Sequence, residues 1–63
     1  MNFTTDETYP GLFEVYVRGT EYAGMIDEEA DGFWAAVDAN TDEEADGFDT
    51  FTEALNWLLS VSR

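Results

Sequence analysis

Hydrophobic and polar positions alternate clearly between residues 12 and 18, which read LFEVYVR. Phe13, Val15 and Val17 lie on one face of an extended chain, and the residues between them lie on the other. The β-branched and aromatic side chains in this run are also the types that strands favour. The pattern therefore predicts a β-strand over residues 12–18.

Two more extended segments follow this strand. Gly19-Thr20 suits a tight hairpin turn, and residues 21–26 (EYAGMI) predict the partner strand, in which Gly24 indicates a bulge. Residues 33–37 (FWAAV) come after an Asp-Gly turn signal and predict a third strand. The sequence thus predicts a three-stranded antiparallel meander, with Phe48 as the candidate start of a short fourth strand.

The last segment has the pattern of an amphipathic helix. Thr50 and Glu53 have the spacing of a capping box, in which the hydroxyl accepts the amide three residues on and the carboxylate reaches back. Apolar residues then recur three and four positions apart, at Phe51, Ala54, Leu55, Leu58 and Leu59. We expect a helix from about Phe51 to Val61. At about three turns it is too short to be stable alone, so it packs on the sheet.

Residues 1–11 lack such a pattern and end in Pro10-Gly11, a strong turn signal. We interpret them as an irregular lead-in. A chain of 63 residues supports one small hydrophobic core. The sequence therefore predicts one α+β domain, with the lead-in at 1–11, a three- to four-stranded antiparallel meander over 12–48 and a C-terminal helix over 50–62.

A single helix covers only one face of such a sheet. The covered face is expected to contain Phe13, Val15, Val17, Ile26, Phe33, Ala35 and Val37. The opposite face is expected to contain Leu12, Tyr16, Met25 and Trp34. A patch of Tyr, Met and Trp on a small domain indicates a partner-binding surface or a homodimer seam, unless residues 1–11 fold back and cover it.

The charge balance narrows the class of protein. The chain contains 15 Asp and Glu against 2 Lys and Arg, which gives a net charge of −13, and Lys is absent altogether. A field of this sign repels nucleic acid and anionic membrane surfaces and attracts basic protein surfaces. We therefore expect no direct binding of nucleic acid and no membrane association.

The absent residue types exclude several kinds of chemistry. Without Cys or His the chain has no disulfide, no zinc site of the usual kind, no thiol nucleophile and no imidazole base. No apolar run approaches the roughly 20 residues that span a bilayer, and no signal-peptide pattern is present. We expect a cytoplasmic protein that is not an enzyme and takes no cofactor.

One internal repeat stands out. The heptapeptide DEEADGF occurs at residues 27–33 and again, without change, at residues 42–48. The two copies hold eight of the 15 carboxylates: Asp27, Glu28, Glu29, Asp31, Asp42, Glu43, Glu44 and Asp46. The simplest interpretation is a soluble Asp-Gly turn used twice. Because loops before and after one strand emerge at its opposite ends, we expect two acidic clusters roughly 20 Å apart.

Alternating oxygen side chains in and before the second copy raise the question of calcium. Counted from the first of them, the odd positions are Asp38, Asn40, Asp42, Glu44 and Asp46. An EF-hand loop requires Gly at its sixth position and usually Glu at its twelfth, whereas this chain has Glu43 and Asp49 there. We therefore expect no dedicated metal site.

Hydrolysis by paired carboxylates is also disfavoured. It requires a partly desolvated pocket, and a sheet with one helix is not expected to form one.

Two hypotheses for function remain. In the first, the chain is an interaction module whose acidic clusters, with Tyr16, Met25 and Trp34, bind a basic protein surface. Two carboxylate clusters separated in this way resemble phosphates across a DNA groove, and small acidic proteins that imitate DNA are similar to this chain in charge density and size. The partner would then be a nucleic-acid-binding protein that the chain inhibits or regulates by competition, as a regulatory or virus-encoded factor does.

In the second hypothesis the charge is a general adaptation to salt. An ordinary small domain from a halophilic proteome would suppress Lys and carry excess Asp and Glu without a charge-specific site, and its role would be structural or in dimerisation. At molar salt the Debye length falls to about 3 Å, so the self-repulsion at −13 nearly vanishes. This hypothesis explains the missing Lys better, whereas the clustering of acids into two loops favours the first.

Overall fold

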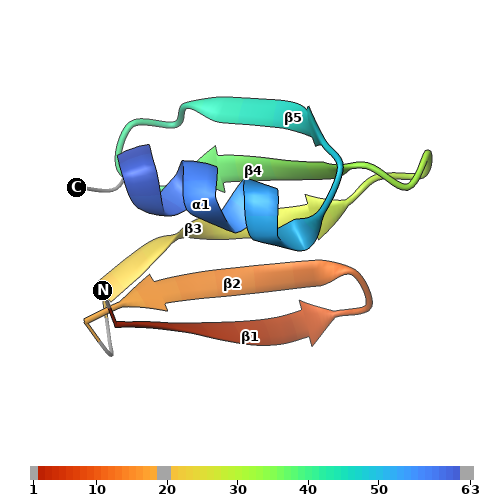
Figure 1. Ribbon diagram of the computed structural model, residues 1–63. Helices are drawn as coiled ribbons and strands as arrows, with labels where there is room; N and C mark the ends of the chain where they lie inside the picture. The colour runs from red at the N-terminus through yellow and green to blue at the C-terminus, as the bar shows by residue number, and fades with distance from the viewer. Residues whose placement is uncertain (1, 19–20, 62–63) are drawn as a thin grey trace.

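The structure, a computed structural model, describes residues 2–18 and 21–61. Five strands form one antiparallel sheet in sequential order, and one helix packs against it (Figure 1). The elements are β1 (Phe3–Tyr9), β2 (Leu12–Val17), β3 (Glu21–Glu28), β4 (Trp34–Asp38), β5 (Glu44–Phe48) and α1 (Phe51–Val61). The α+β meander with a C-terminal helix is confirmed. The predicted count of three to four strands is wrong, because the described residues form five.

The first added strand is β1, in the segment that we expected to be an irregular lead-in. β1 pairs with β2 from Phe3, opposite Val17, to Tyr9, opposite Leu12. All seven residues of β1 are exposed, so the alternation that reveals a half-buried strand is missing from its sequence. Pro10-Gly11 forms the turn between β1 and β2, and Gly11 has the positive φ of 82° that a type II turn requires after Pro.

The bulge predicted at Gly24 is present in the pairing of β2 with β3. Val15 lies opposite Gly24 and Tyr16 lies opposite Tyr22, which leaves Ala23 as the extra residue on β3. A side chain at Gly24 has no room, because a Cβ there would lie 2.1 Å from the carbonyl oxygen of Val37. The predicted turn at residues 19–20 lies outside the described residues.

The helix α1 matches its predicted bounds. The Thr50 hydroxyl accepts the Glu53 amide at 3.1 Å, as predicted. The Glu53 carboxylate accepts the Asp49 amide at 3.0 Å, one residue further back than the capping box predicts. α1 lies across β3, β4 and β5, whereas the β1–β2 hairpin extends beyond it (Figure 1). The core beneath the helix consists of Val15, Val17, Ala23, Ile26, Ala36, Ala54, Leu55 and Leu58.

The strand β4 has the opposite register from the one predicted. Trp34 and Ala36 face α1 with Asp38, whereas Ala35 and Val37 point to the open face, and Phe33 stays in the preceding loop at 41% exposure. The run FWAAV offers one aromatic residue in either frame, so its pattern does not decide between them. Ala36 is fully buried in the core with Ala54, Leu55 and Leu58 of the helix.

The strand β5 is the second correction to the strand count. Phe48 was the candidate start of a fourth strand, but it is the last residue of β5, opposite Trp34. Its ring packs against Trp57 of α1, with centroids 6.2 Å apart. The fifth strand is therefore made of the last five residues of the second DEEADGF copy, which we had expected to be a loop.

Candidate acidic protein interface

The two identical heptapeptides have different backbones. In the first copy, Asp27 and Glu28 end β3, and residues 29–33 make the loop to β4. In that loop the Glu29 amide donates to the Phe33 carbonyl at 2.7 Å. In the second copy, Asp42 and Glu43 lie in the β4–β5 connection, and residues 44–48 form β5. The first copy thus forms the end of a strand and a loop, whereas most of the second copy forms an edge strand.

The strand β5 brings the second copy back to the first, because it runs antiparallel to β4. Two surface depressions are lined by residues of both copies. One of about 260 Å³ is lined by carboxylates of both copies together with Ala35 and Val37. A second, of about 520 Å³, is lined by Glu29, Asp31 and Asp46 beside Phe33. We call the five carboxylates that line them, Asp27, Glu29, Asp31, Glu44 and Asp46, the acidic junction.

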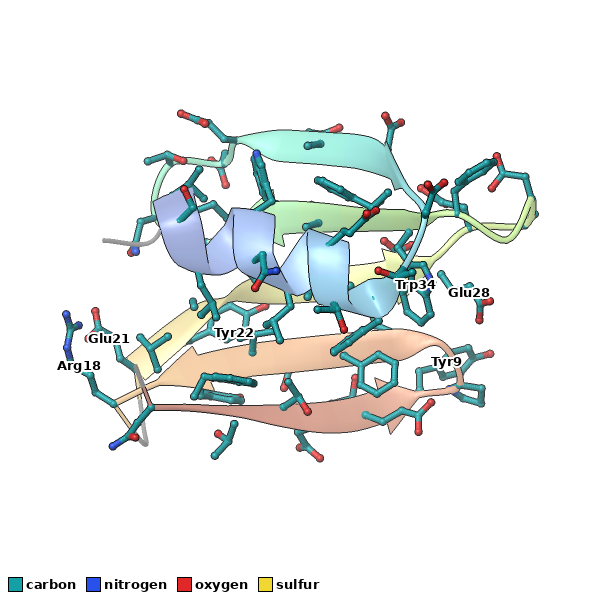
Figure 2. The ribbon with its side chains drawn as sticks, viewed as in Figure 1. Tyr9, Arg18, Glu21, Tyr22, Glu28 and Trp34 are labelled. Carbon is teal, nitrogen blue, oxygen red and sulfur yellow. The ribbon has the colours of Figure 1, made fainter. Side chains whose placement is uncertain are left out.

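The expectation of two separate acidic clusters is therefore wrong. It assumed that both copies are loops at opposite ends of one strand, whereas the second copy is a strand that spans the distance. Asp42 and Glu43 alone stay at the far end of β4, where the Glu43 carbonyl accepts the Asp38 amide. Glu28 lies beside Trp34 at the end of β3, on the side of the sheet that carries the helix (Figure 2). These three carboxylates do not line either depression of the junction.

The carboxylates of the acidic junction repel one another, and this repulsion affects the pKa of Glu29. The neighbouring carboxylate of Asp27, then partial desolvation, then Asp31 and Asp46 raise the pKa of the Glu29 carboxyl above its usual value. Asp46 belongs to the other heptapeptide, so this coupling joins the two copies. Arg18, the one basic side chain within residues 2–18 and 21–61, lies at the opposite end of the sheet, 2.9 Å from Glu21 (Figure 2). No described cation therefore offsets the junction.

The acidic junction borders the open face of the sheet, the face away from α1. One cross-strand row on this face runs Asp6, Glu14, Met25, Val37 and Glu44, from β1 to β5. The apolar middle of the row thus lies between carboxylates on both sides. Met25 lies on the face on which it was predicted, and it is half-buried there. Cross-strand neighbours at this spacing can contact the same partner.

An aromatic pair occupies the next row of the open face. The rings of Tyr16 and Tyr22 lie 5.5 Å apart between centroids at 54°, and the Tyr16 hydroxyl donates to the Glu14 carboxylate at 3.1 Å. This hydrogen bond, with some desolvation and the Glu14 charge, raises the pKa of Tyr16. Burial and then Glu14 raise the pKa of Tyr22. Sequence reasoning placed Tyr16 on this face but missed Tyr22, which the hairpin pairing of residues 12–18 with 21–26 would have revealed.

Trp34 is the predicted site residue that the structure moves elsewhere. Its ring packs edge-on against Phe51 of α1, with centroids 5.4 Å apart, and at a tilt of 47° against Phe13, with centroids 6.1 Å apart. Trp34 therefore lies on the helix side of the sheet (Figure 2). The prediction that Trp34 lies on the open face is wrong, because the register of β4 is shifted by one residue. The open face is apolar through Leu12, Met25 and Val37 instead.

The oxygen-bearing side chains that were considered as calcium ligands have another role, which Asp38 illustrates. Asp38, the first of them, is fully buried, and its carboxylate accepts the amide of Thr41 at 3.0 Å and the Thr41 hydroxyl at 2.8 Å. It therefore shapes the β4–β5 turn. Across residues 2–18 and 21–61, no group of three or more carboxylates is placed to hold a metal ion.

Comparison with known proteins leaves the geometry as the basis for function. No protein-family model, curated protein or solved structure matches this chain. In the part of the chain that the structure describes, no helix has the length and apolar character needed to cross a bilayer.

Proposed function

We propose that this chain is a non-enzymatic interaction module that binds a basic protein surface through its open sheet face. Carboxylates of the acidic junction pair with Lys and Arg side chains of the partner, and the centre around Tyr16, Tyr22 and Met25 supplies short-range apolar contact. The partner is a nucleic-acid-binding protein whose phosphate site the carboxylates occupy, so the chain acts as a competitive inhibitor or regulator.

The convergence of the two heptapeptides supports this proposal. Five carboxylates gathered beside an uncovered face, with the raised pKa of Glu29 among them, cost the folded state repulsion that a dispersed arrangement would avoid. A cationic partner relieves that repulsion on binding. The field of the chain also steers such a partner, which makes the association rate fall with ionic strength.

A matched pair of charge reversals tests this function. Glu29→Lys, Glu44→Lys and Asp46→Lys alter the acidic junction, whereas Glu28→Lys, Asp42→Lys and Glu43→Lys alter carboxylates outside it. Each triple changes the net charge by the same amount, from −13 to −7, since each reversal adds two. Far-UV CD establishes that both variants fold.

The readout is competition with nucleic acid. Partners are captured from the source cells on the immobilised wild-type chain, and release of labelled nucleic acid from each purified partner is followed by fluorescence anisotropy. We expect the junction triple to lose competition and the control triple to retain it. Equal loss in both variants, or partners that keep their nucleic acid, would refute the proposal.

Salt adaptation is the second candidate, and one observation favours it. Carboxylates also lie outside the acidic junction, as with Asp6, Glu7 and Asp49, in a chain without Lys. An ordinary domain of a halophilic proteome has this composition. Thermal unfolding by far-UV CD at about 0.05 M and about 2 M KCl, which span long and short Debye lengths, tests it. A chain that folds cooperatively only in the concentrated salt supports this candidate, and a chain stable in both contradicts it.

A further inference from the structure

The outer edge of β1 has no neighbouring strand among the described residues. β1 is first in the order of the sheet, and its other edge pairs with β2 (Figure 1). All seven of its residues are exposed. An edge strand presents a row of backbone amides and carbonyls that can pair with another chain. Proteins usually protect such an edge with Lys, Pro, a bulge or shortness, and β1 contains neither Lys nor Pro.

The direction of the free backbone groups follows from one hydrogen bond. The Arg18 amide donates to the Asn2 carbonyl at 3.2 Å, which makes these two residues a hydrogen-bonded pair of the antiparallel ladder. Such pairs alternate along the ladder. Thr4 and Asp6 therefore bond to β2. The amides and carbonyls of the residues between and beside them point away from the sheet, and these are Phe3, Thr5 and Glu7.

The opposite edge of the sheet is built differently. β5 has five residues, and its pairing with β4 shifts register between Trp34 and Ala36. Gly47 within it has a φ of 79°, which interrupts the extended backbone. β1 pairs regularly from Phe3 to Glu7, and its register shift comes only beyond Glu7. β1 is thus the edge suited to accept a strand.

The negative charge of β1 indicates which kind of chain can pair with its outer edge. Asp6 and Glu7 lie near its centre, and Glu14 lies opposite Asp6 on β2. A second copy paired antiparallel along the whole of β1 would place Asp6 opposite its own equivalent, and each copy carries −13. An extended segment with Lys or Arg opposite the two acids, and an apolar residue opposite the half-exposed Phe3, avoids that repulsion and gains charge pairs.

We propose that the basic partner adds an extended segment to β1 as a sixth strand. This proposal rests on the proposed function for the identity of the partner as a basic protein. Main-chain hydrogen bonds to Phe3, Thr5 and Glu7 provide affinity, and two basic side chains opposite Asp6 and Glu7, with an apolar one opposite Phe3, provide selectivity. The partner then holds the molecule by an edge as well as by the open face.

The test uses a model peptide and a proline variant. The capped heptapeptide VTKRTTV places Lys opposite Glu7 and Arg opposite Asp6 when it pairs antiparallel to β1. Its matched control carries N-methyl groups on the third and fifth residues, whose amides would face β1, so charge is unchanged. In the protein, Thr5→Pro removes an outward amide that edge strands can spare, and Thr5→Val keeps it.

We expect NMR titration at millimolar peptide to shift the amides of β1. N-methylation or Thr5→Pro should weaken binding about tenfold or more, whereas Thr5→Val should not. Amide dispersion of the free variants shows that each is folded. Absence of shifts, equal binding of the methylated peptide, or shifts centred on Tyr22 and Glu44 would overturn the proposal. A wild-type dimer that Thr5→Pro makes monomeric in sedimentation would also overturn it, in favour of a second copy.

The two proposals fail separately. If a captured partner loses binding to the acidic-junction triple but keeps full affinity for Thr5→Pro, strand addition is wrong and the proposed function stands. If the peptide binds β1 as described while both charge-reversal triples compete equally, the edge binds basic strands and the acidic junction is not the partner site.

Discussion

The two DEEADGF copies have the same sequence but different secondary structure. The first is preceded by Met25 and Ile26, so β3 runs into it and its remaining residues turn back toward β4. The second is preceded by the turn that Thr41 and Asp38 stabilise, so its residues leave that turn and pair with β4. The neighbours along the chain, rather than the seven residues themselves, decide which becomes loop and which becomes strand.

One local property is the same in both copies. Gly32 has a φ of 90° and Gly47 has a φ of 79°, although one lies in a loop and the other in a strand. The Asp-Gly signal therefore predicts the conformation of the glycine in each place and not the element around it. The comparison separates what a short segment determines alone from what pairing determines.

The largest expected effect comes from breaking the contact that anchors the two copies. Trp34 follows the first copy and lies opposite Phe48 of the second, with its ring against Phe51. Trp34→Ala should lower the free energy of unfolding by about 3 kcal/mol, measured by urea unfolding at fixed salt. Tyr9→Ala, at a residue that is 69% exposed, should change it by less than about 0.5 kcal/mol. Equal stabilities of the two variants would contradict this packing.

The glycines test the property that the copies share. Gly32→Ala and Gly47→Ala both place a Cβ at a positive φ, and neither Cβ would meet another atom within 4 Å. Backbone strain alone then acts, so each change should cost about 1 kcal/mol and lower Tm by about 4–8 °C. A large cost at one glycine and none at the other would show that the surrounding element, not the Asp-Gly signal, sets the conformation.

The aspartates before these glycines should differ. The Asp31 carboxylate accepts the Phe33 amide at 3.0 Å, whereas within the described residues no hydrogen bond to the Asp46 carboxylate is present. Both changes relieve repulsion at Glu29, but only Asp31→Ala also loses a hydrogen bond. Asp46→Ala should therefore raise Tm by about 2 °C, and Asp31→Ala should have a lower Tm than Asp46→Ala. Scanning calorimetry at low salt measures both. An equal or higher Tm for Asp31→Ala would remove the distinction between the copies.

The smallest effect is a pH dependence at Glu29. The pKa of Glu29 is raised in the folded chain, chiefly by Asp27. Ionisation of this carboxyl is therefore less favourable in the folded state than in the unfolded state. The contribution of Glu29 to stability is full below its ordinary pKa and is lost as pH rises through the raised value. As pH rises from the ordinary carboxyl pKa through the raised one, wild-type Tm should fall relative to that of Glu29→Gln at low salt. Parallel Tm curves for the two proteins would contradict the shift.

Local signals explain which parts of the fold could be predicted. The α1 segment carries its own cap in Thr50 and Glu53 and its own apolar stripe, so its bounds follow from the sequence. The strand β2 is half-buried and alternates accordingly. The strand β1 is exposed throughout and exists because β2 offers it a partner, a cause that no pattern within residues 3–9 records.

The candidate site was predicted in its residue types and not in its arrangement. The eight repeat carboxylates were chosen from the sequence, but which of them converge depends on β5 returning along β4. Trp34 was placed on the wrong face because Ala35 and Ala36 make either register of β4 acceptable by pattern. Contacts between segments that are distant in sequence decide both points.

A spin label tests most directly that the two copies converge. The chain contains no Cys, so Asp31→Cys provides one attachment site for a nitroxide in the first copy. Paramagnetic broadening of backbone amides then reports which part of the second copy is near. We expect the strongest broadening at Asp46 and Gly47, which line a depression with residue 31, and weaker broadening at Asp42 and Glu43. Broadening that is strongest at Asp42 and Glu43 would contradict the convergence and the acidic junction with it.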